Sequence, residues 1–349
     1  MKQVDVVVPC YNYGSYLDDC VNSVLCQTHE NVRILIIDDA SSDDTPDIAQ
    51  ALCRDQRVIY RRHKSNQGHV ATFNEGLDWA SADYTLLLSA DDVLTLQSLE
   101  RSVKLMESNP EVGMTYGLIS ILTDDSGLNS CVADPDCDMV EVIPGLFWIQ
   151  QCCIATRNLV ATPTAIVRTE IQKRVGGYDP SLPHTGDLEM WLRIASCSSI
   201  GFINEHQAWY RKHSCNMHKQ FDGVSELAQV IEAMRGFVVK AGNRGSVYSP
   251  LVDAAQKRIA IIAFWRAYWC FAQHRVGDCR KYLEFSTEMD PGIIKSRDYH
   301  KLKVKLLCGV TISSFLSQMT DGIRRTGMVG SAERDLDDAP KRVIPTSWI

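Results

Sequence analysis

The first 110 residues alternate between short, continuously apolar runs and segments with apolar residues at helical spacing. The apolar runs are typical of strands buried on both faces, and they cover Val4–Val8, Ile34–Ile37, Val58–Tyr60 and Tyr84–Leu88. Helical segments between such strands imply right-handed crossovers and a largely parallel sheet. We therefore expect an α/β fold whose ligands bind beyond the carboxyl ends of the strands.

The composition argues against several other classes of protein. Lys plus Arg number 36 and Asp plus Glu number 43, so the formal net charge of −7 disfavours nucleic acid as a partner. The 13 cysteines include no Cys-x-x-Cys pair, which argues against a zinc ribbon and favours a reducing, cytoplasmic location. No apolar run reaches the roughly 18 residues of a membrane span. The opening MKQVDVVVPCYN is expected to be a strand rather than a signal peptide.

The pattern changes near residue 220 and predicts three parts. Residues 1–218 form the α/β domain, residues 219–325 carry helical signals without strand signals, and residues 326–349 are polar and expected to be a flexible tail. Within the helical region, residues 260–291 predict two helices with a break at Val276-Gly277-Asp278, which resembles one tetratricopeptide repeat.

The helical region is also rich in large aromatic residues. Trp265, Tyr268, Trp269 and Phe271 are too many for a solvated helix. We expect them to pack inside the protein or to contact a protein partner or a membrane. The second alternative would place the chain peripherally at the inner face of a membrane.

Polar and aromatic residues follow the first two predicted strands. Pro9 ends the first strand, and Tyr11 and Asn12 come directly after it, where the ring of Tyr11 could stack on a nucleobase. Asp39 leaves the second strand and could accept hydrogen bonds from the N–H groups of a uracil-type or guanine-type base. An ordinary strand exit and helix capping are the structural alternatives at these positions.

Two further groups of residues suit a diphosphate with a cation. Asp91 and Asp92 leave the last of these strands, and paired carboxylates there suit Mg²⁺ or Mn²⁺, although a solvated turn is the alternative. Arg211 could pair with phosphate, and His213 could complete a metal shell. A basic edge strand would also explain Arg211 and His213, and the residues around His213 offer no fourth ligand for zinc.

Asp187 stands at the start of a predicted amphipathic helix that runs to Ser196. A carboxylate there is stabilised by the helix dipole, so Asp187 could be a helix cap. The same carboxylate, if it faces a cleft, could equally serve as a general base.

Taken in order, these motifs resemble the family 2 glycosyltransferases with the GT-A fold. The resemblance covers roughly residues 3–215 and rests on VVVPCYNYGSYL, DDASSDDT, Asn66-Gln67-Gly68, LLLSADD, GGYD and GDLEMWLR. It implies a Rossmann-like mixed sheet and an inverting transfer of a sugar from a nucleotide-diphosphate sugar, with Mn²⁺ or Mg²⁺ as the cofactor.

The resemblance also implies roles for individual residues. Asp39 would contact the base, Asp91 and Asp92 the ribose and metal, and Asp187 would deprotonate the acceptor hydroxyl. The full donor site would comprise Pro9, Tyr11, Asn12, Asp39, Asn66, Gly68, Asp91 and Arg211, and the metal site Asp91, Asp92 and His213. Two departures are Ser89, where the family often has aspartate, and Gly186, where an acidic residue often precedes the catalytic aspartate.

The sequence leaves the sugar, the nucleotide and the acceptor open. By analogy we expect a glycan or lipid-linked acceptor and a place in cell-surface polysaccharide or glycoconjugate synthesis. The alternative is a catalytically silent protein of the same fold that binds a nucleotide sugar or acts as a scaffold. A nucleotide-binding oxidoreductase is disfavoured because no G-x-G-x-x-G follows the first strand, and a nucleotidyltransferase because Tyr11-Asn12-Tyr13 replaces a glycine-rich basic loop.

Overall fold

The structure is a computed structural model that describes residues 2–123, 140–213 and 223–308. Within these ranges, nine strands form one sheet in the order β3-β2-β1-β4-β8-β6-β9-β5, and β7 pairs with β9. The strands are β1 (Val4–Cys10), β2 (Val32–Asp38), β3 (Val58–Arg62), β4 (Tyr84–Leu87), β5 (Val93–Leu94), β6 (Val112–Thr123), β7 (Val140–Ile143), β8 (Ile166–Arg168) and β9 (Ser199–Lys212).

The sheet is mixed, as the resemblance implied. β1 pairs in parallel with β2 and β4, and β2 pairs in parallel with β3. β8 then runs antiparallel to both β4 and β6, while β9 is parallel to β6 and antiparallel to β5. The carboxyl ends of β1, β2, β3 and β4 therefore meet at one edge of the sheet.

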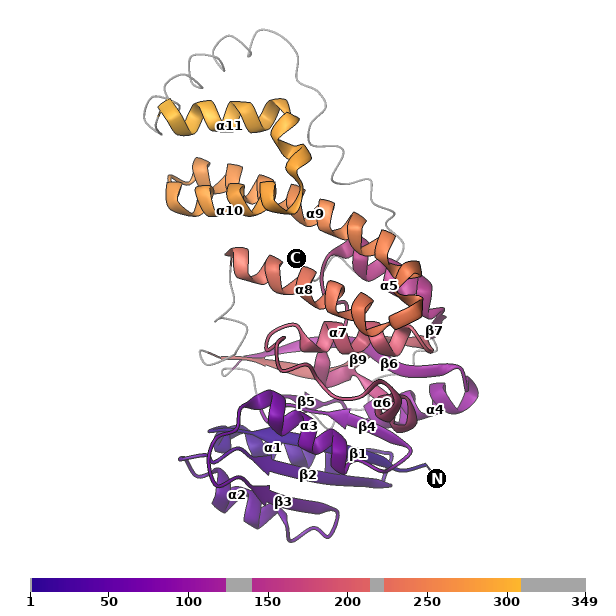
Figure 1. Ribbon diagram of the computed structural model, residues 1–349. Helices are drawn as coiled ribbons and strands as arrows, with labels where there is room; N and C mark the ends of the chain where they lie inside the picture. Colours follow the sequence, from indigo (N-terminus) through magenta and orange to yellow (C-terminus); the bar gives the residue numbers. More distant parts are fainter. Residues whose placement is uncertain (1, 124–139, 214–222, 309–349) are drawn as a thin grey trace.

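Helices cover the sheet, and the buried strands explain the apolar runs (Figure 1). Val6 and Val8 belong to the core beneath α1 and α4, while Val7 lies on the opposite face with Leu35 and Ile37. A strand with side chains buried on both faces is mainly apolar, and the one buried carboxylate of β1, Asp5, is paired with Arg33 at 2.7 Å. The helices of this domain are α1 (Gly14–Leu25), α2 (Thr45–Leu52), α3 (His69–Trp79), α4 (Ser98–Ser108), α5 (Gly145–Ala155), α6 (Thr169–Val175) and α7 (Gly186–Ala195).

A helical region follows β9, as predicted. It comprises α8 (Gly223–Lys240), α9 (Gly245–Ala272), α10 (Val276–Met289) and α11 (Arg297–Cys308), with α11 farthest from the sheet in Figure 1. The predicted break is wrong by a few residues, because Val276 begins α10. The chain instead leaves the helix at Gln273–Arg275, where His274 adopts a left-handed backbone (φ 63°) that ends α9. The predicted boundary at residue 218 and the predicted tail at 326–349 lie outside the described residues.

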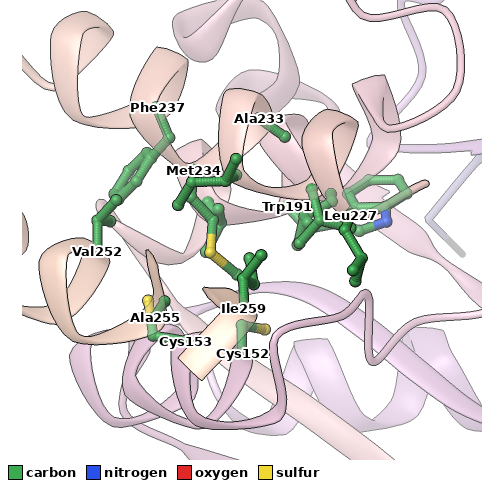
Figure 2. Packing of buried hydrophobic residues seen from close by; sticks show 14 of the residues in the cluster. Cys152, Cys153, Trp191, Leu227, Ala233, Met234, Phe237, Val252, Ala255 and Ile259 are labelled. Atoms are coloured by element: carbon green, nitrogen blue, oxygen red, sulfur yellow. The ribbon is translucent and has the colours of Figure 1, made fainter. Parts of the chain in front are cut away.

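The first part of the helical region shares a core with the α/β domain (Figure 2). Trp191 of α7, Met234 and Phe237 of α8, and Ile259 of α9 are all buried in one cluster, together with Cys152 of α5. Because these apolar side chains come from both parts of the chain, the sheet domain and helices α8 and α9 are held together mainly by burial of apolar surface.

An ionic group spans this junction. The Arg193 guanidinium donates to both carboxylate oxygens of Glu189 at 2.8 Å, within α7. Lys240, at the end of α8, reaches Asp179 at 2.7 Å and Glu189 at 3.3 Å. Glu189 is fully buried, so it depends on these two cations for compensation.

The predicted aromatic residues of α9 divide between the core and the surface. Phe271 is buried, whereas Trp265 and Trp269 remain 52% and 58% exposed. Ile261 is also exposed one turn before Trp265, so the three side chains form an apolar stripe along one side of α9. No helix within the described residues is long and apolar enough to cross a membrane.

Candidate active site

The residues that follow β1 are hydrogen-bonded to the loop that follows β2. Asn12 has a left-handed backbone (φ 56°), and its backbone N–H donates to Oγ of Ser41 at 2.9 Å. The side-chain Oδ1 of Asn12 accepts from the backbone N–H of Ser42 at 2.8 Å. Tyr11, the residue before, is 48% exposed, and Pro9 pairs in register with Ile37 of β2. Asn12 therefore shapes the loop, while the ring of Tyr11 is open to a ligand.

Asp39 is buried at the carboxyl end of β2 and accepts several hydrogen bonds. Its Oδ1 accepts from the backbone N–H of Gln67 and from His63 Nδ1, both at 2.7 Å, and Oδ2 accepts from the backbone N–H of Gly68 at 2.9 Å. Gly68 has φ 86°, a conformation that favours glycine, and its N–H also donates to Oδ1 of the exposed Asn66. Burial opposes ionisation of Asp39, but the hydrogen bonds outweigh it and lower the pKa.

His63 joins this group, and the sequence analysis missed it. His63 directly follows β3, so it lies at the carboxyl end of a strand, where ligands bind in folds of this kind. Its Nδ1 lies 2.7 Å from Asp39 and its Nε2 lies 2.7 Å from Glu75 of α3. Burial would lower the pKa of His63, but the hydrogen bonds with Asp39 and Glu75 raise it above its ordinary value of 6.5. His63 thus fixes the orientation of the Asp39 carboxylate.

Asp91 and Asp92 lie between β4 and β5, and both are buried. Asp92 Oδ1 accepts from the backbone N–H of Arg211 at 3.1 Å. Asp91 Oδ2 lies 3.0 Å from Nε2 of His213. Burial, followed by the charge of Asp91, raises the pKa of Asp92 well above 3.8. The two carboxylates therefore form a pair whose repulsion a nearby cation would relieve.

Arg211 is held by neighbouring protein groups. Its Nε donates to the backbone carbonyl of Asp91 at 3.0 Å, and one Nη donates to Asp19 at 3.1 Å. The guanidinium carbon lies 4.7 Å from the ring centre of Tyr16, and the His213 ring stacks on Tyr16 with 5.2 Å between the ring centres. Arg211 thus shapes the Asp91–Asp92 turn, and its contact with a phosphate stays a prediction.

The chemistry of the Asp91 and His213 side chains suits a divalent cation. A carboxylate oxygen and an imidazole nitrogen already lie 3.0 Å apart, beside the second carboxylate of Asp92. Across residues 2–123, 140–213 and 223–308, however, no three His, Cys, Asp or Glu side chains converge as a complete set of ligands. Of the three predicted ligands, Asp91 and His213 are in contact, whereas Oδ1 of Asp92 accepts a hydrogen bond from the backbone of β9.

Asp187 lies in the first turn of α7, which begins at Gly186, one residue before the predicted start, and has Thr185 at its cap position. Its Oδ1 accepts from the N–H of Leu188 at 2.8 Å. Its Oδ2 accepts from Nδ2 of Asn158 at 2.9 Å and from Oγ1 of Thr162 at 3.1 Å. Asp187 is therefore not the helix cap, and nearby side chains orient its carboxylate.

Burial raises the pKa of Asp187 above 3.8, against the opposing effects of Leu188 and Thr162. A raised pKa makes a carboxylate a stronger base, which suits proton abstraction. Asp187 also lines a pocket of about 450 Å³ between α7 and helices α8 and α9. Asn158 and Thr162 were missed by the sequence analysis, since they lie in an irregular segment without periodic spacing.

The two halves of the site are connected through a short turn. Thr162 belongs to the 3₁₀ turn η1 (Thr162–Thr164), which contacts β4 and β5 on either side of Asp91 and Asp92. The same threonine donates to Asp187. One small element therefore contacts both the strands that flank the Asp91–Asp92 turn and the Asp187 carboxylate.

Comparison with known sequences points to a single family. Residues 5–137 match the model of glycosyl transferase family 2. An uncharacterized glycosyltransferase of Rickettsia conorii is 31% identical over 210 residues, which are 58% of this chain and 32% of that protein. One from Nostoc sp. is 29% identical over 229 residues, 62% of this chain and 66% of that protein. The chain thus spans about a third of the first relative and about two thirds of the second.

Solved structures share the fold. S. aureus TarS in complex with UDP-GlcNAc has a TM-score of 0.56 at 15% identity, covering 83% of this chain and 92% of that one. The mannosyltransferase PcManGT from Pyrobaculum calidifontis, in complex with GDP-Man and Mn²⁺, has a TM-score of 0.51 at 14% identity, covering 84% of this chain and 86% of that one. These matches confirm the predicted GT-A fold with a helical C-terminal region.

Proposed function

We propose that this chain, which belongs to glycosyl transferase family 2 through residues 5–137, transfers a sugar with inversion from a nucleotide-diphosphate sugar to a hydroxyl acceptor. The observation that carries the proposal is the Asp187 carboxylate, which is oriented by Asn158 and Thr162, lines a pocket and has a raised pKa. A scaffold that only bound nucleotide sugars would need no such base, so the geometry favours catalysis over the silent alternative.

The donor would bind along the carboxyl edge of the sheet. Tyr11 would stack on the base, and the remaining acceptor capacity of the ionised Asp39 would receive a base N–H. The lowered pKa of Asp39 keeps it an acceptor at neutral pH. Asn12, Asn66 and Gly68 would shape the loops around the nucleoside, because each of them hydrogen-bonds within these loops. The fold neighbours in complex with UDP-GlcNAc and GDP-Man support this placement.

The diphosphate would lie beside Asp91 and Asp92. Asp91 and His213 would hold a divalent cation, Mn²⁺ or Mg²⁺, with Asp92 as the second carboxyl group beside it. When bound, this ion supplies positive charge that stabilises the leaving diphosphate. The Arg211 guanidinium would keep the turn in place and add positive charge near the phosphates.

Asp187 would act on the acceptor. Its carboxylate takes the proton of the attacking hydroxyl as the new C–O bond forms at the anomeric carbon. The bond between that carbon and the diphosphate oxygen breaks with its electron pair leaving on the nucleoside diphosphate. Attack from the face opposite the leaving group inverts the anomeric centre, and the shared anchoring of both sites through η1 holds the reactants in line.

The setting of this activity is a further part of the proposal. A glycan or lipid-linked acceptor in cell-surface polysaccharide or glycoconjugate synthesis fits a cytoplasmic enzyme of this family. The exposed side chains of Trp265 and Trp269 would then rest peripherally on a membrane surface or a protein partner.

The direct test screens the full chain against UDP-, GDP- and dTDP-sugars. Thermal shift with and without Mn²⁺ would identify the donor, and release of nucleoside diphosphate would report turnover. We expect one donor to stabilise the protein in a cation-dependent way and to be turned over. A protein that is stabilised by a donor but releases no nucleoside diphosphate with any acceptor would support the silent alternative instead.

A further inference from the structure

The pocket beside Asp187 has two walls of different origin. One wall comes from the α/β domain and includes Asn158, Asp187 and Leu188. The opposite wall comes from the helical region and includes Val230 of α8 and Ile262 of α9. The volume of the pocket, about 450 Å³, falls within the roughly 300–1,000 Å³ typical of small-molecule sites. The helical region therefore completes a cavity that the α/β domain alone would leave open.

The lining combines apolar patches with charged groups. Leu227 and Val230 offer an apolar surface on α8. Glu226 of α8 and Arg266 of α9 also line the pocket, and their side chains form an ion pair at 2.9 Å that joins the two helices. Arg157 lines the α/β side and forms no ion pair with any residue in the described part of the chain. The pocket thus offers hydrogen-bond donors and acceptors around an apolar wall.

We propose that this pocket is the acceptor site and that it takes a saccharide, an inference that rests on the proposed glycosyltransferase function. A pyranose ring has an apolar face that can lie against Leu227 and Val230, and a rim of hydroxyls that charged side chains can bind. Arg266 and Glu226 bind these hydroxyls, and one further hydroxyl faces Asp187, which removes its proton. A lipid chain would bring no polar group to the Arg157 guanidinium or to the Glu226–Arg266 ion pair, so the polar lining favours the sugar.

On this inference the helices α8 and α9 determine acceptor specificity, whereas the carboxyl edge of the sheet binds the donor. The two functions can then be separated by mutation. A side chain that fills the pocket from α9 blocks the acceptor and leaves the donor site unchanged, because Ile262 lies on the wall opposite Asp187 and outside every donor contact described above.

The experiment uses the full chain with its donor and a panel of p-nitrophenyl glycosides as acceptor probes. Ile262→Trp fills the pocket, and Ile261→Trp is the matched control, since Ile261 is 49% exposed on the adjacent position of α9. Arg266→Gln removes one partner of the ion pair without adding bulk, and Arg258→Gln is its control at an exposed site of α9. Thermal unfolding verifies that all four variants fold.

We expect Ile262→Trp to lower transfer to glycosides at least tenfold while hydrolysis of the donor by water stays within about twofold of wild type. Arg266→Gln should raise the KM for the glycoside at least fivefold without changing the KM for the donor. Ile261→Trp and Arg258→Gln should behave like wild type. Equal transfer by Ile262→Trp and Ile261→Trp would overturn the pocket proposal while leaving the glycosyltransferase function intact.

A binding measurement keeps the proposal testable without turnover. Saturation-transfer NMR should detect a glycoside on the wild type, with nucleoside diphosphate present, and show its loss in Ile262→Trp. Absence of glycoside binding to the wild type at millimolar concentration would overturn the proposal. Failure of the proposed function would instead appear as absence of donor turnover in every assay.

Discussion

Asn158 donates a hydrogen bond from Nδ2 to Oδ2 of Asp187 at 2.9 Å, and Thr162 donates to the same oxygen at 3.1 Å. Neutral donors orient the carboxylate without neutralising its charge, so Asp187 remains able to accept a proton. The other acidic residues of this region, Asp179 and Glu189, are instead bound to Lys240 and Arg193. These ion pairs make them structural residues and leave Asp187 as the candidate base.

The first prediction concerns Asn158→Ala. A hydrogen bond to a charged group contributes roughly 1.5–3 kcal/mol, so kcat should fall by about 10- to 100-fold. Removing a donor from the carboxylate also favours its protonated form, so the acidic limb of the kcat–pH profile should move to higher pH. Steady-state kinetics across pH would measure both effects. An unchanged profile would show that Asn158 does not position the base.

The second prediction concerns His63, which bridges Asp39 and Glu75 while Arg61 lies 3.5 Å from Glu75. The pKa of His63 is raised in the folded protein, so its protonated form stabilises the fold. This contribution is fully present below the ordinary pKa of about 6.5 and is lost as pH rises through the raised value. Between about pH 6 and about pH 9, thermal stability should therefore fall more in wild type than in His63→Gln.

The control for this prediction is His300→Gln, at an exposed position of α11. Its pH dependence should follow that of wild type. If His63→Gln showed the same pH dependence as His300→Gln, then the bridge between Asp39 and Glu75 would not contribute to stability.

The third prediction concerns the cation. If Asp91 and His213 hold it, Asp91→Ala should remove nearly all transfer, because losing a charged ligand at a catalytic metal costs several kcal/mol in the transition state. EDTA should abolish the activity of wild type, and Mn²⁺ or Mg²⁺ should restore it. Transfer that persists in EDTA, or only a few-fold effect of Asp91→Ala, would contradict a metal-dependent reaction.

The fourth prediction concerns the junction between the two parts of the chain. Phe237 of α8 is fully buried in the shared core, so Phe237→Ala should lower the free energy of unfolding by about 3–5 kcal/mol. Val239 lies two residues away and is 79% exposed, so Val239→Ala should change it by less than about 0.5 kcal/mol. Denaturant unfolding would measure the free energy of unfolding of both variants. Similar stability of both variants would mean that α8 contributes little to the fold.

Much of the N-terminal architecture could be predicted from sequence, because strands such as β1 are mainly apolar and their ends carry distinctive residues. The sequence did not show which carboxylates of the acidic segment after β2 hold the loop and which one is available to a ligand. Asp38 accepts from Tyr60 and from the backbone of Ser41, and Asp43 accepts from the backbone of Gly14. These two carboxylates hold the loop, whereas Asp39 is presented at the edge of the sheet.

The residues that complete the site could not be predicted, because they depend on contacts between distant segments. Asn158 and Thr162 reach Asp187 across more than 20 residues of sequence. The Asp91–His213 contact joins residues 122 positions apart. The pocket itself requires α8 and α9 to pack on α7, and periodicity indicates an apolar helix face without saying which surface it covers.

The most direct measurement pairs calorimetric donor binding with a transfer assay on Asp187→Asn. Asparagine keeps the shape and can still accept from Leu188, but its amide nitrogen then faces the Nδ2 donor of Asn158, so thermal unfolding must first verify that the variant folds. It cannot take the acceptor proton, so kcat should fall by about 10²- to 10⁴-fold while donor affinity stays near that of wild type. Transfer at the wild-type rate, or loss of donor binding together with turnover, would contradict the assignment of Asp187 as the general base.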